Sequence, residues 1–350
     1  MRDFACTTCG QRLAFENSEC LHCHSRLGFS LPDRQLRVLD EQQTVSVDGV
    51  VHERCACAGT ARCNWLAPTT ATEGMCASCA LTRTRPAAGS DAMPAFADAE
   101  AAKRRLVVEL TELGLPITGR AVDPDGGLCF DLLDSSGTNV ITGHANGVIT
   151  LDLAEGDDVH REQLRVSMEE PYRTLLGHFR HETGHYYFTV LVGTGPELPR
   201  FTELFGDPAT DYQAALDRHY SQGAPDGWEQ EHVSSYATMH PAEDWAETFA
   251  HYLHIVDGLE TADSFGLQVG DPSRSAGERE RPITPDGSSP SVAGAVGEWL
   301  VLTLALNAMS RSIGEHDLYP FVLSPTVVAK LDFVHRCVGG AADPRSVSAV

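Results

Sequence analysis

The spacing of apolar residues predicts a change from helix to strand and back along this chain of 350 residues. Apolar positions recur at helical intervals over 97–113 and stop at Gly114, which predicts a packing helix. Residues 128–153 instead alternate apolar and polar positions, with turn signals at Ser135–Gly137 and Asn146–Gly147. We predict two or three antiparallel strands in this stretch.

Longer apolar helices dominate the second half of the chain. One is predicted to begin at Glu169–Pro171, where acids precede a proline, and to run to Gly193. Another starts at Pro241. Two strongly apolar segments, 292–314 and 317–338, are predicted to be core helices, and we assign no chemistry to them.

Linker composition divides the chain. Small residues, Pro and Gly follow the N-terminal cysteines, so we place a boundary near residue 90, between a region of residues 1–90 and a domain of residues 91–340. Residues 264–291 are rich in Gly, Pro, Ser and charge, which predicts a long exposed loop. The length is ample for two compact units with sizeable cores.

The formal net charge of −23 is unevenly distributed. Residues 1–90 contain nine Arg, no Lys and nine acidic residues, so the other 260 residues carry the whole excess. Because an acidic body repels phosphate backbones and anionic lipids, we expect neither nucleic acid nor a membrane as partner. No apolar run reaches the roughly 18 to 20 uncharged residues of a membrane span, and the N-terminus has no signal core. We therefore predict a cytoplasmic protein.

Nine of the eleven cysteines lie between residues 6 and 79, which in a reducing compartment indicates metal ligation rather than disulfides. Two CxxC pairs separated by ten residues form the first set: Cys6, Cys9, Cys20 and Cys23. This spacing predicts a zinc ribbon, because two short knuckles bring four thiolates around one ion without a large core. Iron in a rubredoxin-like site is an alternative, and a thioredoxin-like redox pair lacks its strand-helix context.

The second set offers five cysteines for four ligand positions. Cys76 and Cys79 form one knuckle. We favour Cys55 and Cys63 as the other half, with Cys57 as a bystander or an alternative ligand. Three histidines beside the cysteines are further candidates: His22, His24 and His52. Four thiolates already complete each shell, and structural sites of this kind are closed, so neither site is expected to be catalytic.

The segment GHFRHETGHYYF places an HExxH motif on a predicted helix. His181 and His185 are four residues apart, so both imidazoles project from one face and can bind one ion. Glu182 lies beside the first ligand, where it can take a proton from zinc-bound water without coordinating. The neighbouring residues are largely apolar, and buried imidazoles beside a carboxylate need a partner, which is usually zinc. The alternative is a surface helix with solvated His and Glu.

A catalytic zinc site of this kind needs a third protein donor. In the helix that starts at Pro241, Glu243 and Glu247 are one turn apart and share a face. We favour Glu243 as the ligand and Glu247 as the carboxylate that orients a zinc-bound histidine, with the reverse as the alternative. The competing donors are three histidines: His240, His251 and His254.

Two further features fit a peptidase. Tyr236 stands seven residues before Glu243, and a phenol there could donate a hydrogen bond to the oxyanion of a tetrahedral intermediate. The alternative is a packing tyrosine. Zinc peptidases often lay an extended substrate along the edge of a sheet, and residues 148–153 are the candidate edge strand.

The chain resembles the zinc-binding metallopeptidases of bacteria that carry an N-terminal zinc-ribbon domain, from residue 4 to about residue 335. The resemblance is carried by CTTCGQRLAFENSECLHC, CNWLAP with CASCALTRTRP, GHFRHETGHYYF, YATMHPAEDWAETFAHYLHI and ALNAMSRSIGEHDLYPFVLSPTVVAKLDFVH. The HPAEDWAE segment is also similar to the third-ligand helix of the anthrax lethal factor and of bacterial regulators of glucose uptake. That similarity puts Glu243 on the ligand and Tyr236 on the assisting tyrosine. Cys57 departs from the family pattern, which leaves the second cysteine site less certain.

These features together predict an α+β protein. A small β region with zinc ribbons precedes a mostly helical, zincin-like domain with a small antiparallel sheet. We expect one catalytic and two structural zinc ions, and a gluzincin-type peptidase that acts on polypeptides with Glu182 as general base. One alternative is a protein-binding zinc-ribbon adaptor with an inactive zinc site. Another is a hydrolase of non-peptide amides.

Overall fold

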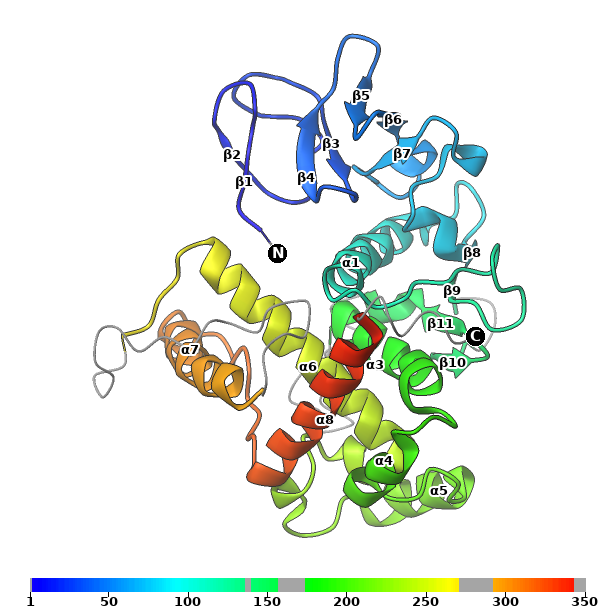
Figure 1. Cartoon of the computed structure of the whole chain (residues 1–350), viewed down its shortest axis with the longest axis vertical. Helices are drawn as coiled ribbons and strands as arrows, with labels where there is room; N and C mark the ends of the chain where they lie inside the picture. Colours follow the sequence, from blue (N-terminus) through cyan, green and yellow to red (C-terminus); the bar gives the residue numbers. More distant parts are fainter. Residues whose placement is uncertain (1, 136–139, 157–173, 271–291, 343–350) are drawn as a thin grey trace. The chain divides into compact units, whose positions relative to one another are not determined.

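The fold is mixed, as predicted: small strands with the two cysteine clusters come first, and a four-stranded sheet and a mostly helical part follow in the sequence. The computed structural model describes residues 2–135, 140–156, 174–270 and 292–342 (Figure 1). The chain forms two compact units, each built from two segments: Met1–Val108 with Thr118–Arg161, and Glu109–Ile117 with Glu162–Val350. The boundary predicted near residue 90 stays a prediction.

The first unit begins with seven short strands in three small sheets. These are β1 (Phe4–Ala5) with β2 (Arg12–Leu13), β3 (Leu27–Ser30) with β4 (Gln35–Val38), and β5 (Thr44–Val47), β6 (Val50–Arg54) and β7 (Leu66–Pro68). All their pairings are antiparallel. Four aromatic rings form a core between the sheets, because Phe15 lies 4.8 Å from Phe29, which lies 5.1 Å from Trp65, and Phe4 packs against both phenylalanines. This small core and the cysteine sites together hold the region, as is usual where few residues are available to bury.

A fourth sheet in the first unit corrects one sequence prediction. Its strands are β8 (Thr82–Thr84), β9 (Cys129–Leu133), β10 (Gly143–Ala145) and β11 (Val148–Asp152), in the order β10-β11-β9-β8. Only β10 and β11 are antiparallel, while β11 with β9 and β9 with β8 are parallel. The predicted antiparallel pair is therefore present as β10 and β11, joined at Asn146–Gly147, but the prediction was wrong for β9, because alternation reports which side chains are buried and not which neighbour a strand pairs with.

The pairing of β11 also contradicts the prediction that residues 148–153 form an edge strand. Strand β11 pairs along its whole length with β9, and its residues 148–150 also pair with β10, so most of its backbone groups are already used. An added substrate strand needs unpaired backbone groups, so residues 148–153 do not offer the edge that the sequence suggested.

Helix α1 (Met93–Glu112) follows the linker and confirms the predicted packing helix. Near its start it buries Glu100 and Lys103, which form an ion pair of 2.7 Å with both side chains almost completely covered. Glu100 also lies 3.8 Å from the sulfur of Cys79. The first half of α1 therefore packs against the second cysteine cluster.

The second unit is a bundle of helices with α6 at its centre. Its members are α3 (Leu175–Tyr187), η5 (Phe188–Val192), α4 (Leu198–Phe205), α5 (Tyr212–Gln222), η6 (Trp228–Gln230), η7 (Tyr236–Thr238), α6 (Pro241–Ser264), α7 (Ala293–Ser312) and α8 (Pro325–Ala342). Helix α6 packs on α3, α4, α7 and α8. The core around α6 is aromatic, with Trp245 about 6 Å from the rings of Phe201, Phe205 and Phe333.

Two helix boundaries agree with the sequence, whereas α8 begins at Pro325, inside the segment 317–338 that was predicted to be a helix. Pro241 is the first residue of α6, and Gly193 ends the segment that carries the HExxH motif, with φ of 34°. Helix α3 begins after Thr174, whose hydroxyl accepts a hydrogen bond from the Gly177 amide. The predicted start at Glu169–Pro171 lies outside the described residues, as does most of the predicted loop at 264–291.

Helix α7 is, among the described residues, the one helix long and apolar enough to cross a membrane by length and composition alone, with a mean hydropathy of 1.2. A core helix of a soluble protein passes the same test, and 39% of this stretch is buried within the protein. One such helix is therefore weak support for a membrane span, and the cytoplasmic location stays a prediction.

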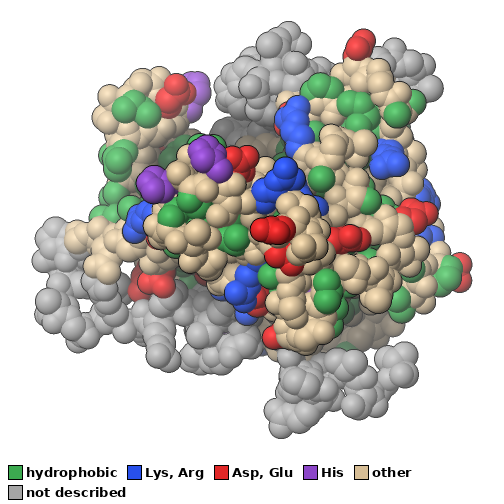
Figure 2. Space-filling view, turned by 90° about the horizontal axis from the view of Figure 1, so that it is seen from above, with side chains coloured by type: hydrophobic (Ala, Val, Ile, Leu, Met, Phe, Trp, Pro, Cys, Tyr) green, Lys and Arg blue, Asp and Glu red, His purple; other side chains and the backbone are tan. Residues whose placement is uncertain are grey.

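Figure 2 shows one face of the molecule, on which Arg and Lys side chains are interspersed with acidic and apolar ones. The coloured residues of this face form no continuous basic area of the kind that binds a phosphate backbone. The expectation that nucleic acid is not a partner stays a prediction.

Candidate metal centre

Three predicted zinc ligands converge from two helices of the second unit. His181 and His185 lie one turn apart on α3, and Glu243 lies in the first turn of α6. The Nε2 atom of His181 is 3.0 Å from Oε2 of Glu243 and 3.3 Å from Nε2 of His185, and the third side of this triangle, from His185 to Glu243, is 3.3 Å. One atom from each side chain therefore points at a common centre.

These distances fit zinc. Zinc bonds to imidazole nitrogen and carboxylate oxygen are about 2.0–2.1 Å long, which places tetrahedral ligand atoms about 3.3 Å apart. The observed separations of 3.0–3.3 Å match this edge length. Three protein donors leave one tetrahedral position for water or substrate, as catalytic zinc sites do.

A glycine inside the motif allows the two helices to meet closely. A Cβ atom at Gly184 would lie 3.0 Å from Cα of Ala246 and 3.3 Å from Cβ of Phe249, so a larger side chain would push α3 away from α6. The indole nitrogen of Trp245 donates to the Gly184 carbonyl at 2.8 Å, which fixes the contact. Close helix packing therefore brings Glu243 within reach of the two histidines.

Glu247 lies where the sequence placed it, behind the first histidine. Its Oε1 atom is 2.6 Å from Nδ1 of His181, while its Oε2 atom accepts a hydrogen bond of 2.6 Å from the hydroxyl of Ser234. A carboxylate on Nδ1 orients the imidazole and leaves Nε2 facing the metal. The geometry favours Glu243, rather than Glu247, as the ligand, because Glu243 is the carboxylate that reaches both Nε2 atoms.

The electrostatics of the cluster favour a cation. Burial works to raise the pKa of Glu243, but His181 and His185 hold that pKa well below its usual range. Burial likewise opposes the ionised form of Glu247, and the hydrogen bond with His181 lowers the pKa of Glu247 to about 2. Two ionised carboxylates in a buried site need positive charge between or beside them, which a divalent ion supplies.

Glu182 is buried on α3 next to the histidines. Burial, and then the charge of Glu243, raise the pKa of Tyr212. Tyr236 is close as well, with its ring 6.0 Å from that of His181, and burial raises its pKa far above the usual value. Tyr236 therefore lies beside a predicted zinc ligand, and Glu182 follows His181 on the same helix; their catalytic roles stay predictions.

Tyr212 is a site residue that the sequence analysis missed. Its hydroxyl donates to Oε1 of Glu243 at 3.0 Å, and it shares a hydrogen bond with Tyr236. The Oε2 atom of Glu243 faces the two histidines, so the phenol holds the oxygen that points away from the metal position. No motif marks Tyr212, which begins α5 at a position 31 residues before Glu243.

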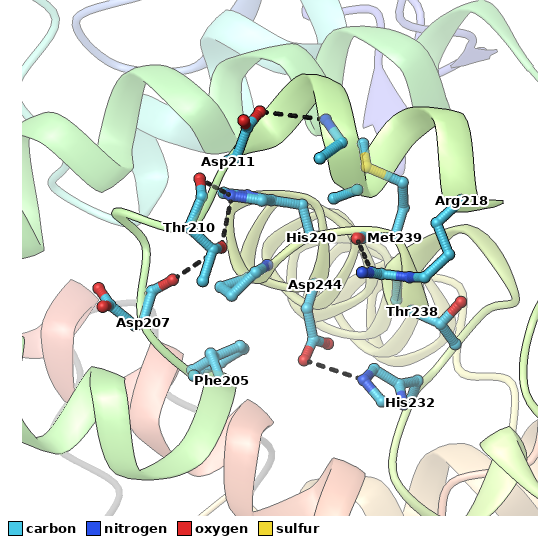
Figure 3. Close-up of a pocket in the computed structure, with 15 residues that line it drawn as sticks. Phe205, Asp207, Thr210, Asp211, Arg218, His232, Thr238, Met239, His240 and Asp244 are labelled. Carbon is cyan, nitrogen blue, oxygen red and sulfur yellow. Dashed lines mark hydrogen bonds and ion pairs between the residues drawn. The ribbon is translucent and has the colours of Figure 1, made fainter.

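The competing histidines have other roles. His240 caps α6, since its Nδ1 accepts from the Ala242 amide, and its Nε2 contacts the Thr210 hydroxyl at 2.9 Å (Figure 3). His251 is hydrogen-bonded to the Tyr319 hydroxyl at 2.8 Å. His254 packs with its ring 5.4 Å from Trp299. None of the three belongs to the metal-binding group of the described residues.

Figure 3 shows residues that line a cavity beside the start of α6. The volume of this cavity is about 430 Å³. It is lined by Asp244, which follows the ligand Glu243 on α6 and pairs with Lys330 at 2.6 Å and more loosely with His232 at 3.7 Å. Burial raises the pKa of Asp244 to about 7. The donor atoms of the metal group do not line this cavity, so it is separate from the zinc position.

The first cysteine cluster forms a four-sulfur group. The sulfurs of Cys6 and Cys23 are 3.7 Å apart, and those of Cys9 and Cys20 are 3.6 Å apart. Zinc–sulfur bonds of about 2.3 Å place tetrahedral sulfurs about 3.8 Å apart, so the group fits one zinc ion. Hydrogen bonds from Ser25 lower the pKa of the Cys23 thiol to about 6, which favours the thiolate that zinc needs.

The second cluster brings together one sulfur from each favoured cysteine: Cys55, Cys63, Cys76 and Cys79. Cys63 and Cys76 have sulfurs 3.8 Å apart, and the amide of Cys76 donates to the sulfur of Cys55 at 3.3 Å. Cys57 is buried nearby but is not part of the four-sulfur group, and neither cluster includes a histidine among the described residues.

Replacing cysteines one at a time separates ligand from bystander. We expect Cys63→Ser to lower the zinc content by one ion per chain, because three sulfurs cannot complete the tetrahedron. The matched Cys57→Ser variant is expected to keep the wild-type zinc content. Metal analysis of the purified proteins after dialysis measures both. Loss of zinc from Cys57→Ser with retention in Cys63→Ser would reverse the assignment.

A helix with HExxH that meets a glutamate on a second helix, in a chain with two four-cysteine clusters, defines a zinc-binding protein of the metallopeptidase class. The chain belongs to the family described as "Putative zinc-binding metallo-peptidase", whose model matches residues 92–337. A second model, described as a zinc-ribbon domain, matches residues 3–90.

Close relatives occur in mycobacteria. Proteins named only as uncharacterized in Mycobacterium bovis and in two strains of Mycobacterium tuberculosis are each 55% identical to this chain over 340 residues. The alignments cover 97% of this chain and 95% of each relative. No solved structure matches the chain.

Proposed function

We propose that this protein is a zinc-dependent peptidase of the gluzincin type, which hydrolyses peptide bonds at the group formed by His181, His185 and Glu243. The observation that carries the proposal is the triangle of donor atoms with 3.0–3.3 Å sides, because it fits a tetrahedral zinc with one position for water. Bound there, zinc would lower the pKa of a water molecule and polarise the scissile carbonyl.

The residues around the metal position supply the rest of the chemistry. Glu182 accepts the proton of the attacking water as the oxygen bonds to the carbonyl carbon. It then passes that proton to the amine that leaves when the carbon–nitrogen bond breaks. Tyr236 donates a hydrogen bond to the negative charge that develops on the carbonyl oxygen.

Glu243 and Glu247 have distinct roles in this proposal. Glu243 is a metal ligand through Oε2, and Glu247 orients His181 through Nδ1. Tyr212 is a positioning residue, because its hydrogen bond holds Oε1 of Glu243 and keeps that oxygen from turning toward the metal. The four-cysteine sites have no position for water, so we assign them a structural role.

Tyr212→Phe tests the positioning role. We expect zinc affinity at the catalytic site to fall about tenfold, as is typical when a partner of a ligand is removed. The affinity is measured by competition with a chelator in the full-length protein. Tyr220→Phe, on the same helix and 65% exposed, is the matched control and is expected to bind zinc like the wild type. Equal zinc affinity in Tyr212→Phe and Tyr220→Phe would contradict the role.

A further inference from the structure

A second cavity of the helical unit has a volume of about 630 Å³, and none of the three proposed zinc ligands lines it. It is lined by the end of α5 and the loop after it, by η6 and the residues before η7, and by the segment before α8. The lining residues are His219, Gly223, Ala224, Trp228, Glu229, Val233, Ser234, Ser235, Pro320, Phe321 and Val322. The volume lies in the range of pockets that bind small molecules or single side chains of a larger ligand.

The walls of this pocket are mainly apolar. Trp228, Val233 and Pro320–Val322 supply most of the large side chains that line it. Val322 is 67% exposed, so apolar surface is presented to an incoming group. Burial and the nearby charge of Arg218 lower the pKa of His219, which favours the neutral form of this histidine in the wall. Burying an apolar group against this wall gains free energy. The one carboxylate of the lining, Glu229, is exposed, and its charge disfavours an acidic group in the pocket.

Two series of side-chain contacts join the pocket to the metal group. Ser234 lines the pocket, and its hydroxyl donates at 2.6 Å to Glu247, which in turn is 2.6 Å from His181. In the second series, the ring of His219 lies 5.8 Å from the ring of Tyr236, and the ring of Tyr236 lies 6.0 Å from the ring of His181. Only one or two side chains therefore separate the pocket from the proposed zinc ligands.

We infer that this pocket binds a bulky apolar side chain of the polypeptide substrate, at a residue next to the bond that is cut. The inference rests on the proposed peptidase function and adds a substrate class to it. A peptide held with one carbonyl at the metal position extends its neighbouring side chains away from the metal, and the pocket is an apolar space that only Tyr236 separates from His181 along one series of contacts. Small or acidic side chains at the same place leave the pocket unfilled or bring charge against its apolar wall.

Binding of peptide hydroxamates tests the pocket without turnover, because the hydroxamate group binds zinc itself. The compounds carry Leu, Phe, Ala or Asp next to the hydroxamate, and the protein is the zinc-loaded full chain. We expect the Leu and Phe compounds to bind at least about tenfold more tightly than the Ala compound, since each buried methylene adds to the affinity. An Asp compound that binds as tightly as the Leu compound would overturn the inference.

Two substitutions change the pocket in opposite ways. Trp228→Ala removes apolar wall and is expected to lower the Leu-to-Ala affinity ratio at least about threefold. Ala224→Phe fills the pocket and is expected to bring that ratio close to one. The affinity for the Ala compound should stay as in the wild type, which shows that the zinc site is intact. Leu304→Ala, which removes an exposed apolar side chain from α7, is the control. A wild-type ratio in both pocket variants refutes the assignment.

Cleavage of a peptide library separates failure of the inference from failure of the function. Wild-type protein should cut preferentially beside Leu or Phe, and Glu182→Gln should not cut. Cleavage that depends on Glu182 but shows no preference for bulky apolar residues leaves the peptidase standing and overturns the pocket assignment. Absence of any cleavage that depends on Glu182 overturns the peptidase function, and the substrate assignment falls with it.

Discussion

The Glu182→Gln variant is expected to bind as much zinc as the wild type and to lose peptide hydrolysis by about 10²–10⁴-fold. The amide has nearly the shape of the carboxylate but cannot accept the proton of the attacking water. Glu182 is not one of the three donors, which explains why zinc should remain. Metal analysis and a peptide cleavage assay on the same preparation measure the two properties together.

A glutamate outside the site provides the control for this variant. Glu203 is on α4, where it pairs with Arg200 at the surface, and Glu203→Gln is expected to have wild-type activity. Glu182→Gln protein that keeps both zinc and full activity would show that another group removes the proton, and the proposed mechanism would have to be abandoned.

His181→Ala is expected to lose the catalytic zinc, with one ion fewer per chain and no measurable hydrolysis. The change removes a metal donor, and it also removes the partner of two carboxylates, Glu243 at Nε2 and Glu247 at Nδ1. Without the imidazole, the buried carboxylates repel each other and take up protons more readily, which weakens zinc binding further. Zinc content is measured by elemental analysis after dialysis.

The cysteine sites serve as an internal reference in this experiment, because their sulfurs belong to the other compact unit and should keep their metal. His316→Ala, at an exposed histidine of the second unit, controls for the loss of an imidazole and should keep the wild-type zinc content. If His181→Ala binds as much zinc as His316→Ala, the three-donor group is not a metal site.

Replacing His181 and replacing Glu182 are expected to affect the substrate pocket differently. Ser234 lines the pocket and donates to Glu247, which contacts His181. Replacing His181 therefore removes a partner of Glu247 next to the pocket wall and also removes a metal donor. Glu182 is not among the residues that line the pocket. Zinc-loaded Glu182→Gln protein is therefore the suitable form in which to measure how uncleaved peptides bind.

Local periodicity was enough to predict which metal donors share a helical face. A spacing of four puts His181 and His185 on one helical face, and the same rule puts Glu243 and Glu247 on one face of α6. The start of α6 at Pro241 follows from the fixed backbone of proline at a first helical position. These features depend on neighbours a few residues away, so they can be recognised without knowing the fold.

Contacts between distant segments were decided by packing. Alternation in residues 128–153 predicted strands, but the parallel pairing of β9 with β11 depends on the path of the chain between them. Tyr212 reaches Glu243 because α5 and the start of α6 come together in space. The apolar pocket combines residues 219–235 with residues 320–322, which no local pattern connects. The residues therefore specify which donors each helix presents, whereas the close approach of α3 to α6 at Gly184 decides that the donors meet at one point.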